Sequence, residues 1–263
     1  MIPFLHIGWL SIPTYGLMVA MGMLAAFFVI RADLARRGIA TDDSGFAEKF
    51  IAYPCLAGLI GSKIYNELET PREFFADPWR HLLSQYGFTW YGGLLAGAAA
   101  YIWLARRERL PILTMTDAGS PAAAVGYGFG RIGCLLSGDG DYGIPTSLPW
   151  GMSFPNGLVP TTTRVHPTPI YEFIASFLIA WLLWRLGGRA QILKSPDGRQ
   201  NRPGSVFAAF LILTGLARFL VEFIRINPKS LFGLTNAQLA GLFSLLLGLI
   251  LGVWIRRAAL PAS

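Results

Sequence analysis

The sequence predicts an all-α, polytopic membrane protein with about seven transmembrane helices and an outward-facing N-terminus. Of its 263 residues, 53% are hydrophobic and only 14% are charged, whereas soluble domains average about 25% charged residues. The apolar residues fall in long runs separated by short polar stretches, and a helix that crosses a bilayer needs about 20 mostly apolar residues. We therefore interpret residues 1–263 as a single transmembrane helical bundle without a soluble domain.

Seven segments have the length and apolar character expected of membrane spans. They cover residues 13–31, 48–66, 88–105, 117–136, 169–186, 204–225 and 234–255. The fourth is the weakest by hydropathy, because it is rich in Gly and Ala and carries Arg131. No basic region precedes the first apolar run, so we expect no cleavable signal peptide and a first span that stays in the mature protein.

Basic residues gather in every second connecting segment. They are Arg31, Arg36 and Arg37 after the first span, Arg106, Arg107 and Arg109 after the third, Arg185, Arg189, Lys194, Arg199 and Arg202 after the fifth, and Arg256 and Arg257 after the seventh. The positive-inside rule places these segments in the cytoplasm, which gives an N-out, C-in topology. The net charge of +7 is then explained by topology and by anionic membrane lipids, and no nucleic-acid partner is expected.

The connecting segments differ in character. The outer segment 67–87 mixes acidic and aromatic residues, which predicts short interfacial helices in the outer headgroup region. The outer segment 137–168 is rich in Gly, Pro and Thr, which predicts an irregular or locally extended outer loop. The Gly187-Gly188 pair and the turn sequence at 195–198 predict a flexible cytoplasmic connector over 187–203. Cys55 and Cys134 fall in predicted spans, where small packing residues are more common than disulfides.

Ionisable groups inside apolar runs are the main functional signal, because each costs about 2.5–3.5 kcal/mol on insertion scales. Arg131 lies in a glycine-rich run that includes Gly130 and Gly133, and glycines allow close approach of a backbone or ligand. An arginine in this setting predicts an anion site, since its planar fork grips phosphate. The structural alternative is a buried arginine paired with a carboxylate such as Glu172 or Glu222.

A second group of charges lies in the sixth predicted span. Arg218, Glu222 and Arg225 follow one another at i, i+4 and i+7, a spacing that puts all three on one face of a helix. The structural alternative is a self-neutralising stripe of salt bridges. Together with Arg131, this stripe is expected to offer two or three positive charges to one lipid phosphate.

Further polar candidates flank these groups. His166, Tyr171 and Glu172 stand at the outer end of the fifth span, where Pro169 is suited to begin a helix. Each has a structural alternative, as a satisfied polar residue or an interface anchor. The three histidines are widely spaced and form no ligand cluster, so neither a metal nor a cofactor is expected.

Five motifs in order resemble the prolipoprotein diacylglyceryl transferase family over nearly the whole chain. They are Tyr15-Gly16-Leu17-Met18, Tyr91-Gly92-Gly93-Leu94, Gly130-Arg131-Ile132-Gly133, His166-Pro167-x-x-Ile170-Tyr171-Glu172, and Arg218-Phe219-x-x-Glu222-Phe223-x-Arg225. The resemblance implies a seven-span enzyme of the bacterial plasma (inner) membrane. Such an enzyme transfers the diacylglyceryl group of phosphatidylglycerol to the lipobox cysteine of a prolipoprotein, forming a thioether and releasing glycerol phosphate.

The resemblance also implies roles for particular residues. Arg131 and Arg218 correspond to essential arginines, Glu222 to their acidic partner and Tyr15 to an essential tyrosine. The segment containing Asp139, Asp141 and Gly143 corresponds to an acidic, glycine-bounded motif that is one residue shorter in the family. The predicted catalytic residues are Arg131, Arg218, Glu222 and Tyr91. The predicted substrate-binding residues are Tyr15, Gly130, Gly133, Asp139, Asp141, Gly143, His166, Tyr171, Glu172 and Arg225.

The chain departs from the family pattern at the residue expected to accept a proton. Tyr91 stands where a histidine is usual, and Cys134 and Ser137 replace asparagines. The acceptor of the thiol proton is therefore open among Tyr91, His166, Asp139 and Asp141, or the arginines alone ionise the thiol. A covalent role for Cys134 is a further alternative.

Two other functions are compatible with the composition. A divergent paralogue would use a different lipid or acceptor. A transporter for anionic solutes would also place arginines in the membrane, but transporters usually contain structural repeats, and the sequence shows no internal repeat.

The topology is directly testable. Reporter fusions after residue 190 should behave as cytoplasmic, because the basic residues that flank this position orient the chain. Paired fusions within 137–168 should give a periplasmic signal. A periplasmic signal from the fusions after residue 190 would contradict the topology.

Overall fold

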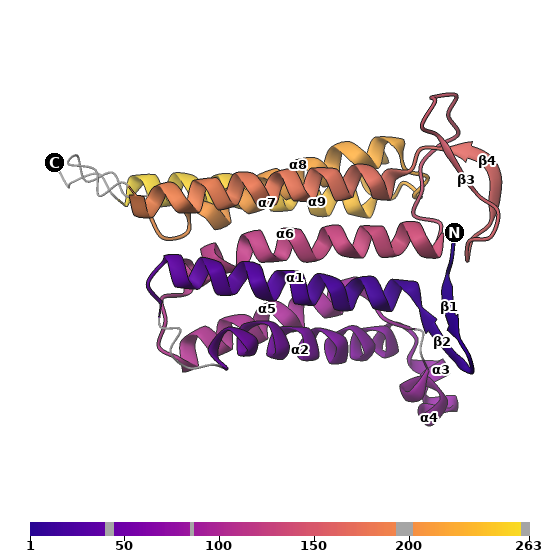
Figure 1. The fold of residues 1–263 in the computed structure, drawn as a ribbon, viewed down its shortest axis with the longest axis horizontal. Coiled ribbons are helices and arrows are strands. Elements are labelled where there is room, and N and C mark those ends of the chain that lie inside the picture. The colour runs from indigo at the N-terminus through magenta and orange to yellow at the C-terminus, as the bar shows by residue number, and fades with distance from the viewer. Residues whose placement is uncertain (40–44, 85–86, 193–201, 259–263) are drawn as a thin grey trace. The chain divides into compact units, whose positions relative to one another are not determined.

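The computed structural model describes residues 1–39, 45–84, 87–192 and 202–258, and the described chain is mostly helical (Figure 1). The long helices are α1 (Thr14–Arg36), α2 (Phe46–Glu69), α5 (Trp90–Arg107), α6 (Ile112–Ser137), α7 (Thr168–Ile192), α8 (Ser205–Val221) and α9 (Asn236–Arg257). Short helices α3 (Pro71–Ala76) and α4 (Pro78–Leu83) and 3₁₀ turns at Glu222–Ile224 and Leu231–Gly233 complete the helical elements. The strands are β1 (Phe4–Ile7), β2 (Leu10–Pro13), β3 (Met152–Phe154) and β4 (Thr161–Val165).

Four of the described helices are long and apolar enough to cross a membrane. They span Thr14–Arg36, Thr168–Gly188, Ser205–Ile224 and Asn236–Arg257. The other three predicted spans fall on α2, α5 and α6. Of these, α6 is rich in small residues and carries Asp117 and Arg131, which lowers its hydropathy. The structure therefore supports a helical membrane protein.

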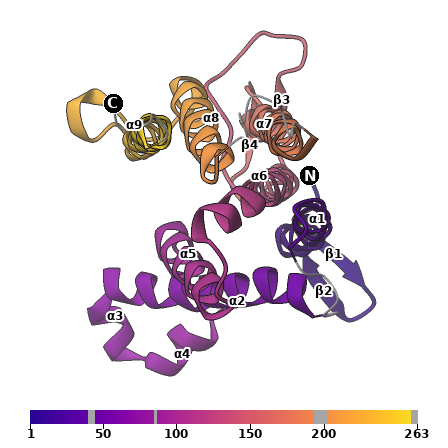
Figure 2. The same cartoon turned by 90° about the vertical axis from the view of Figure 1, so that its left-hand side faces the viewer.

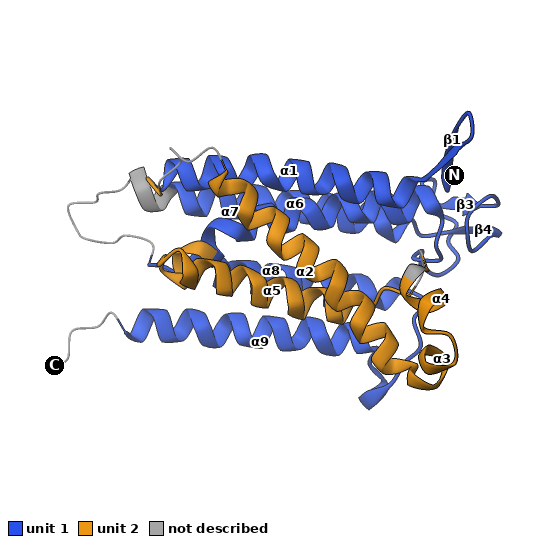
Figure 3. Ribbon diagram, turned by 90° about the horizontal axis from the view of Figure 1, so that it is seen from below, with its two compact units in different colours: residues 1–37, 116–263 blue, residues 38–115 orange. Residues whose placement is uncertain are grey.

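The described chain divides into two compact units, shown in separate colours in Figure 3. Unit 1 contains residues 1–37 and 116–263, and unit 2 contains residues 38–115. In unit 1, the helices α1, α6, α7, α8 and α9 run side by side, as the end-on view in Figure 2 shows. The single bundle over 1–263 stays a prediction.

Small residues let the helices of unit 1 approach closely. A Cβ added at Gly215 of α8 would lie 2.5 Å from the carbonyl oxygen of Gly241 in α9. A Cβ at Gly22 of α1 would lie 3.0 Å from Cβ of Phe129 in α6. Close backbone packing of this kind stabilises helices in lipid, where burial of apolar surface contributes little.

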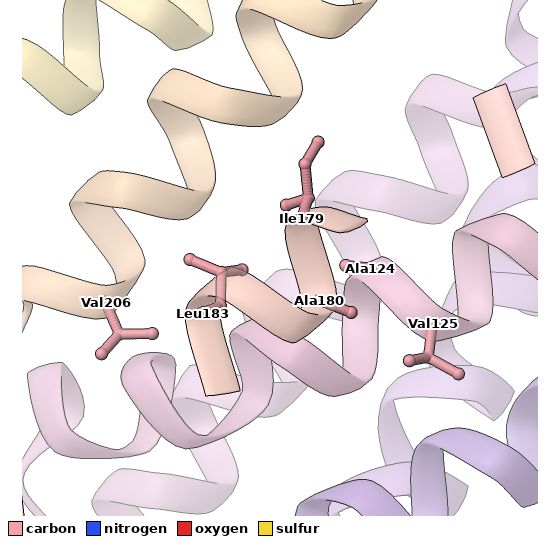
Figure 4. Packing of buried hydrophobic residues seen from close by; sticks show 6 residues of the cluster. All are labelled: Ala124, Val125, Ile179, Ala180, Leu183 and Val206. Carbon is pink, nitrogen blue, oxygen red and sulfur yellow. The ribbon is translucent and has the colours of Figure 1, made fainter. Parts of the chain in front are cut away.

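A small apolar core joins α6, α7 and α8 in unit 1. It consists of Ala124, Val125, Ile179, Ala180, Leu183 and Val206 (Figure 4). Near the end of α1, the buried carboxylate of Asp33 pairs with Arg36 and Arg37, and Arg36 donates to the carbonyl oxygen of Trp184 in α7 at 2.8 Å. These contacts fix α1 and α7 against each other.

The outer segments follow the sequence predictions in part. Segment 67–87 contains the short helices α3 and α4, as predicted, and segment 137–168 is irregular apart from the β3–β4 pair. Pro169 is the second residue of α7. The connector predicted from residue 187 was wrong at its start, because α7 continues through Gly187 and Gly188 to Ile192. The turn sequence at 195–198 lies outside the described residues.

An N-terminal hairpin was not predicted. Strands β1 and β2 pair antiparallel with Ile7 opposite Leu10, so Gly8 and Trp9 form a two-residue turn. Gly8 has φ +61°, a conformation that such turns require and that glycine adopts without strain. Each strand has only four residues, which is too short a run for a clear period-2 signal.

Helices α2 and α5 of unit 2 pack through glycines, which makes their contact testable. A Cβ at Gly61 would lie 2.3 Å from Cβ of Ala96 and 2.7 Å from the carbonyl oxygen of Gly92. Gly61→Ala should therefore lower the free energy of unfolding in detergent by about 1–3 kcal/mol, the usual cost of overpacking. Gly252→Ala is the control, because no described atom lies within 4 Å of its added Cβ. Equal unfolding temperatures for the two variants would contradict this packing.

Candidate active site

Three arginines and three carboxylates meet at one end of unit 1. Arg131 comes from α6, Arg218 from α8, and Arg225 from the chain just after the 3₁₀ turn that follows α8. The carboxylates are Asp141 in the segment after α6, Glu172 in the first turns of α7, and Glu222 in the 3₁₀ turn. The formal charges of this ion network balance, three against three. Such pairing is what a low-dielectric setting demands of buried charge.

Glu172 is the centre of the network. Its Oε1 accepts hydrogen bonds from the Tyr127 hydroxyl at 2.5 Å and from Arg218 Nη1 at 2.7 Å. Its Oε2 accepts from Arg225 Nη1 at 3.1 Å and from Arg131 Nη1 at 3.5 Å. One buried carboxylate thus joins α6, α7 and the end of α8, and it brings the two arginines singled out from the sequence together.

Glu222 connects the network to α9. Its Oε1 accepts from Asn227 Nδ2 at 2.5 Å and from Thr235 Oγ1 at 3.0 Å. Its Oε2 lies 3.1 Å from Arg218 Nη2 and 3.6 Å from Arg225 Nε. Thr235 is the N-cap of α9 and forms a capping box with Gln238, so Glu222 also fixes where α9 begins.

The sequence prediction that Arg218, Glu222 and Arg225 share one helical face was wrong in part. Helix α8 ends at Val221, and Arg225 has an extended backbone. The ion pairs expected of a self-neutralising stripe nevertheless form, because the 3₁₀ turn brings Arg225 back toward Glu222. This departure from the helix also directs Arg225 to Glu172 and Asp141.

The three arginines differ in how many donors they leave available. All three nitrogens of Arg225 face a carboxylate, and its side chain is only 4% exposed. The side chains of Arg131 and Arg218 are 17% and 25% exposed. Among the described residues, Nε and Nη2 of Arg131 and Nε of Arg218 bind no acceptor. These donors are the ones open to an incoming anion.

The segment after α6 places Asp141 against two arginines. Gly138 and Gly140 have φ +60° and +92°, and such left-handed turns favour glycine. Asp141 pairs with Arg131 and Arg225. Partial burial alone would raise the pKa of Asp141, but Arg225 and Arg131 outweigh it and lower that pKa, so this carboxylate stays ionised. Burial and the charge of Asp141 raise the pKa of Asp139.

A group of possible metal ligands was missed from the sequence. Potential ligand atoms of Cys134, Asp139 and Asp141 lie within 4.8 Å of one another. The three histidines are widely spaced, so no metal site was expected from the sequence. These three residues lie together because α6 ends beside its own following loop. Asp141 already neutralises two arginines, which favours an ionic role for it over metal ligation.

Comparison with known proteins decides the family. The family described as prolipoprotein diacylglyceryl transferase matches residues 3–254. The chain belongs to this family. Among its relatives, phosphatidylglycerol–prolipoprotein diacylglyceryl transferase of Geobacter sulfurreducens is 33% identical over 97% of this chain and 95% of its own. The protein of the same name from Clostridium tetani is 31% identical over 91% and 92%, and that from Methylobacillus flagellatus is 32% identical over 95% and 93%.

The remaining residues singled out from the family resemblance fall into separate places. Tyr15 is the second residue of α1. A Cβ at Gly133 would lie 3.0 Å from its ring, so glycine there lets Tyr15 reach α6. A Cβ at Gly143 would lie 2.4 Å from the carbonyl oxygen of Ile224. A Cβ added at Gly130 would have no described atom within 4 Å, and nothing in the structure explains why this residue is a glycine.

Three other predicted residues do not hydrogen-bond to the described ion network. Tyr171 accepts from Trp150 Nε1 at 2.8 Å and lies 3.2 Å from Nδ1 of His166. Tyr91 is in unit 2, at the start of α5, with its ring edge-on to Trp90. Tyr91, which the family resemblance places where a histidine is expected, therefore belongs to the other compact unit.

Three residues that complete the network were not predicted from the sequence. Tyr127, Asn227 and Thr235 each donate to a network carboxylate. Tyr127 also lies beneath the Arg131 guanidinium, 5.0 Å from the ring centroid. Its position four residues before Arg131 on a helix was the available signal, because i and i+4 side chains are neighbours.

The dependence of the network on Glu172 gives a stability prediction. Glu172→Gln leaves three arginines against two carboxylates, and removing one partner of a buried ion pair costs about 3–5 kcal/mol. The thermal unfolding temperature in detergent should fall accordingly. Glu73→Gln is the control, since Glu73 is exposed on α3 and surface substitutions change stability by about 0.5 kcal/mol or less. If Glu172→Gln unfolds at the same temperature as the wild type, Glu172 does not stabilise the fold through this network.

Proposed function

We propose that the protein transfers the diacylglyceryl group of phosphatidylglycerol to the lipobox cysteine thiol of a prolipoprotein. The observation that carries this proposal is the junction at Glu172, where two partly exposed arginines with open donors meet. The names of the relatives support the lipid donor and the protein acceptor. The products are a thioether and glycerol phosphate.

The reaction is a substitution at a glycerol carbon. The cysteine sulfur forms the new C–S bond while the C–O bond to phosphate breaks, and the bonding pair leaves on the phosphate oxygen. A thiol has a pKa near 8.5, so a proton acceptor increases the small thiolate fraction present at neutral pH. The leaving phosphate gains negative charge as the bond breaks. Donors directed at that charge lower the barrier more than they strengthen lipid binding.

Arg131 and Arg218 are the donors we assign to the phosphate. Nε and Nη2 of Arg131 and Nε of Arg218 are the open positions, and guanidinium groups bind phosphate with two parallel hydrogen bonds. In acyl transfer, one donor to a developing oxyanion is worth about 2.7–4 kcal/mol, which sets the scale. Glu172 and Glu222 hold the two arginines in place, and Arg225 serves as an internal counter-ion.

We propose Asp139 as the acceptor of the thiol proton. It lies in the loop beside the network, and its raised pKa makes it a stronger base than an ordinary aspartate. His166 and Tyr91 are the alternatives, but hydrogen bonds place His166 with Tyr171, and Tyr91 belongs to unit 2. Tyr15 and the glycine-bounded segment around Gly143 shape the lipid-binding side.

The membrane setting completes the proposal. Seven crossings with an outside N-terminus, as a single bundle in the bacterial plasma (inner) membrane, would put the ion network at the outer end of unit 1. The alternating basic segments support this orientation. That side is where a secreted prolipoprotein and the outer-leaflet lipid are both within reach.

A divergent paralogue acting on a different lipid or acceptor is the second candidate. The replacements at Tyr91, Cys134 and Ser137 favour it, since each changes hydrogen-bonding capacity within a family motif. Complementation of a conditional transferase mutant separates the two candidates, because a paralogue with another acceptor would fail to restore growth.

The roles of the arginines predict distinct kinetics. Arg131→Lys should lower kcat by about 10²–10³-fold, the effect of losing an oxyanion donor, because lysine keeps the charge but loses the planar fork. The assay follows glycerol phosphate release by purified protein supplied with phosphatidylglycerol and a lipobox peptide.

Cys134→Ala serves as the comparison in this assay. It should retain most activity, because the acceptor peptide supplies the thiol. A normal rate for Arg131→Lys would contradict the phosphate role, and a folded but inactive Cys134→Ala would point to a covalent role for Cys134.

A further inference from the structure

Helices α6 and α8 are joined by Asp117, far along the chain from the ion network. Asp117 is buried near the start of α6. Its Oδ2 accepts from the backbone N–H of Gly204 at 2.8 Å, and its Oδ1 accepts from that of Phe207 at 2.7 Å. A carboxylate from one helix therefore caps the first turn of another, where unpaired N–H groups and the helix dipole favour negative charge.

Helix α8 does not provide this cap itself. Its N-cap residue is Gly204, which has φ +94° and no side chain to accept a hydrogen bond. The hydroxyl of Ser205 donates to the carbonyl oxygen of Arg202 instead. Among the described residues, the amides of Gly204 and Phe207 thus depend on a side chain that α6 holds.

The spacing along the two helices is matched. Arg131 follows Asp117 by 14 residues, and Arg218 follows Gly204 by 14 residues. At 1.5 Å per residue, each interval is about 21 Å. The helices are in contact through Asp117 near their N-terminal ends and through Glu172, which binds both arginines, near their C-terminal ends. They therefore run in the same direction and in register.

We propose that Asp117 is a positioning residue for diacylglyceryl transfer, setting the axial register at which Arg131 and Arg218 share Glu172. This inference rests on the proposed function. A shift of α8 by one residue would move Arg218 by about 1.5 Å relative to Arg131. Displacement of a catalytic group by about 1 Å can cost about 100-fold in rate, so the distant contact has catalytic consequences.

The first test compares kcat and KM of the full-length protein in the transfer assay with phosphatidylglycerol micelles and a lipobox peptide. Asp117→Asn keeps the shape but places an amide N–H₂ against a backbone N–H, so kcat should fall by about 100-fold. Ser205→Ala is the matched control, because it removes a hydrogen bond at the same helix end without touching α6. It should change kcat by about twofold or less.

A double-mutant cycle separates positioning from simple stabilisation. Residues about 21 Å apart normally have independent effects, so the fold-losses of Asp117→Asn and Arg218→Lys should multiply if Asp117 only stabilises the protein. If Asp117 acts through the alignment of the arginines, the double variant should lose little more activity than Arg218→Lys alone. Multiplying losses would overturn the proposal, as would wild-type kcat in folded Asp117→Asn.

Asp117→Glu keeps the inference testable if Asp117→Asn does not fold. Glutamate retains the negative charge that caps α8 but is one methylene longer, so it should preserve the unfolding temperature while lowering kcat at least tenfold. Full kcat in Asp117→Glu would overturn the positioning role. If the wild-type protein shows no transfer, the proposed function itself is wrong. If the wild type is active and the Asp117 variants are unaffected, only this inference is wrong.

Discussion

Neutralising three arginines in apolar surroundings is the constraint on which unit 1 depends. Each guanidinium remains charged, and a buried charge without a partner costs several kcal/mol. The chain supplies the three partner carboxylates from different places: the glycine-bounded loop after α6, the first turns of α7 and the turn that ends α8. The positions of these elements relative to one another are therefore not independent. Asp141 requires the left-handed turns at Gly138 and Gly140, and Glu222 requires the helix to stop at Val221.

Within this balanced network, the arginines have different surroundings and therefore different capacities. Each of the three side-chain nitrogens of Arg225 faces a carboxylate, and the side chain is almost fully buried. Arg131 and Arg218 keep open donors, because the hydrogen bonds they make within the network use only part of each guanidinium. Glu222 extends the same network to the capping box of α9. The features that stabilise the end of the bundle thus also orient the two groups proposed to meet the substrate.

The helices and the charged residues of the site could be predicted from the sequence, because both follow from local rules. Long apolar runs indicated the positions of the seven long helices, and charge within those runs singled out Arg131 and Arg218. A pair between Arg131 and Glu172 was one alternative raised from the sequence, and the structure contains it. That Glu172 also binds Arg218 could not be derived, since the two residues are 46 positions apart in the chain. The end of α8 was missed because Glu222–Arg225 continues a helical pattern that tertiary ion pairs override. The β1–β2 hairpin was missed because each of its strands has only four residues.

A charge-balanced network suits a reaction in which negative charge grows on the leaving group. Phosphatidylglycerol brings one phosphate charge, and the proposed product, glycerol phosphate, carries nearly two at neutral pH. A site with a large positive excess would bind that product tightly and slow its release. In the network seen here, Asp141 is the most exposed carboxylate and stays ionised beside Arg131, so it offsets attraction for the bound anion. The open donors of Arg131 and Arg218 then act mainly on the charge that develops as the C–O bond breaks. Stabilisation concentrated in the transition state is the part of binding energy that raises kcat.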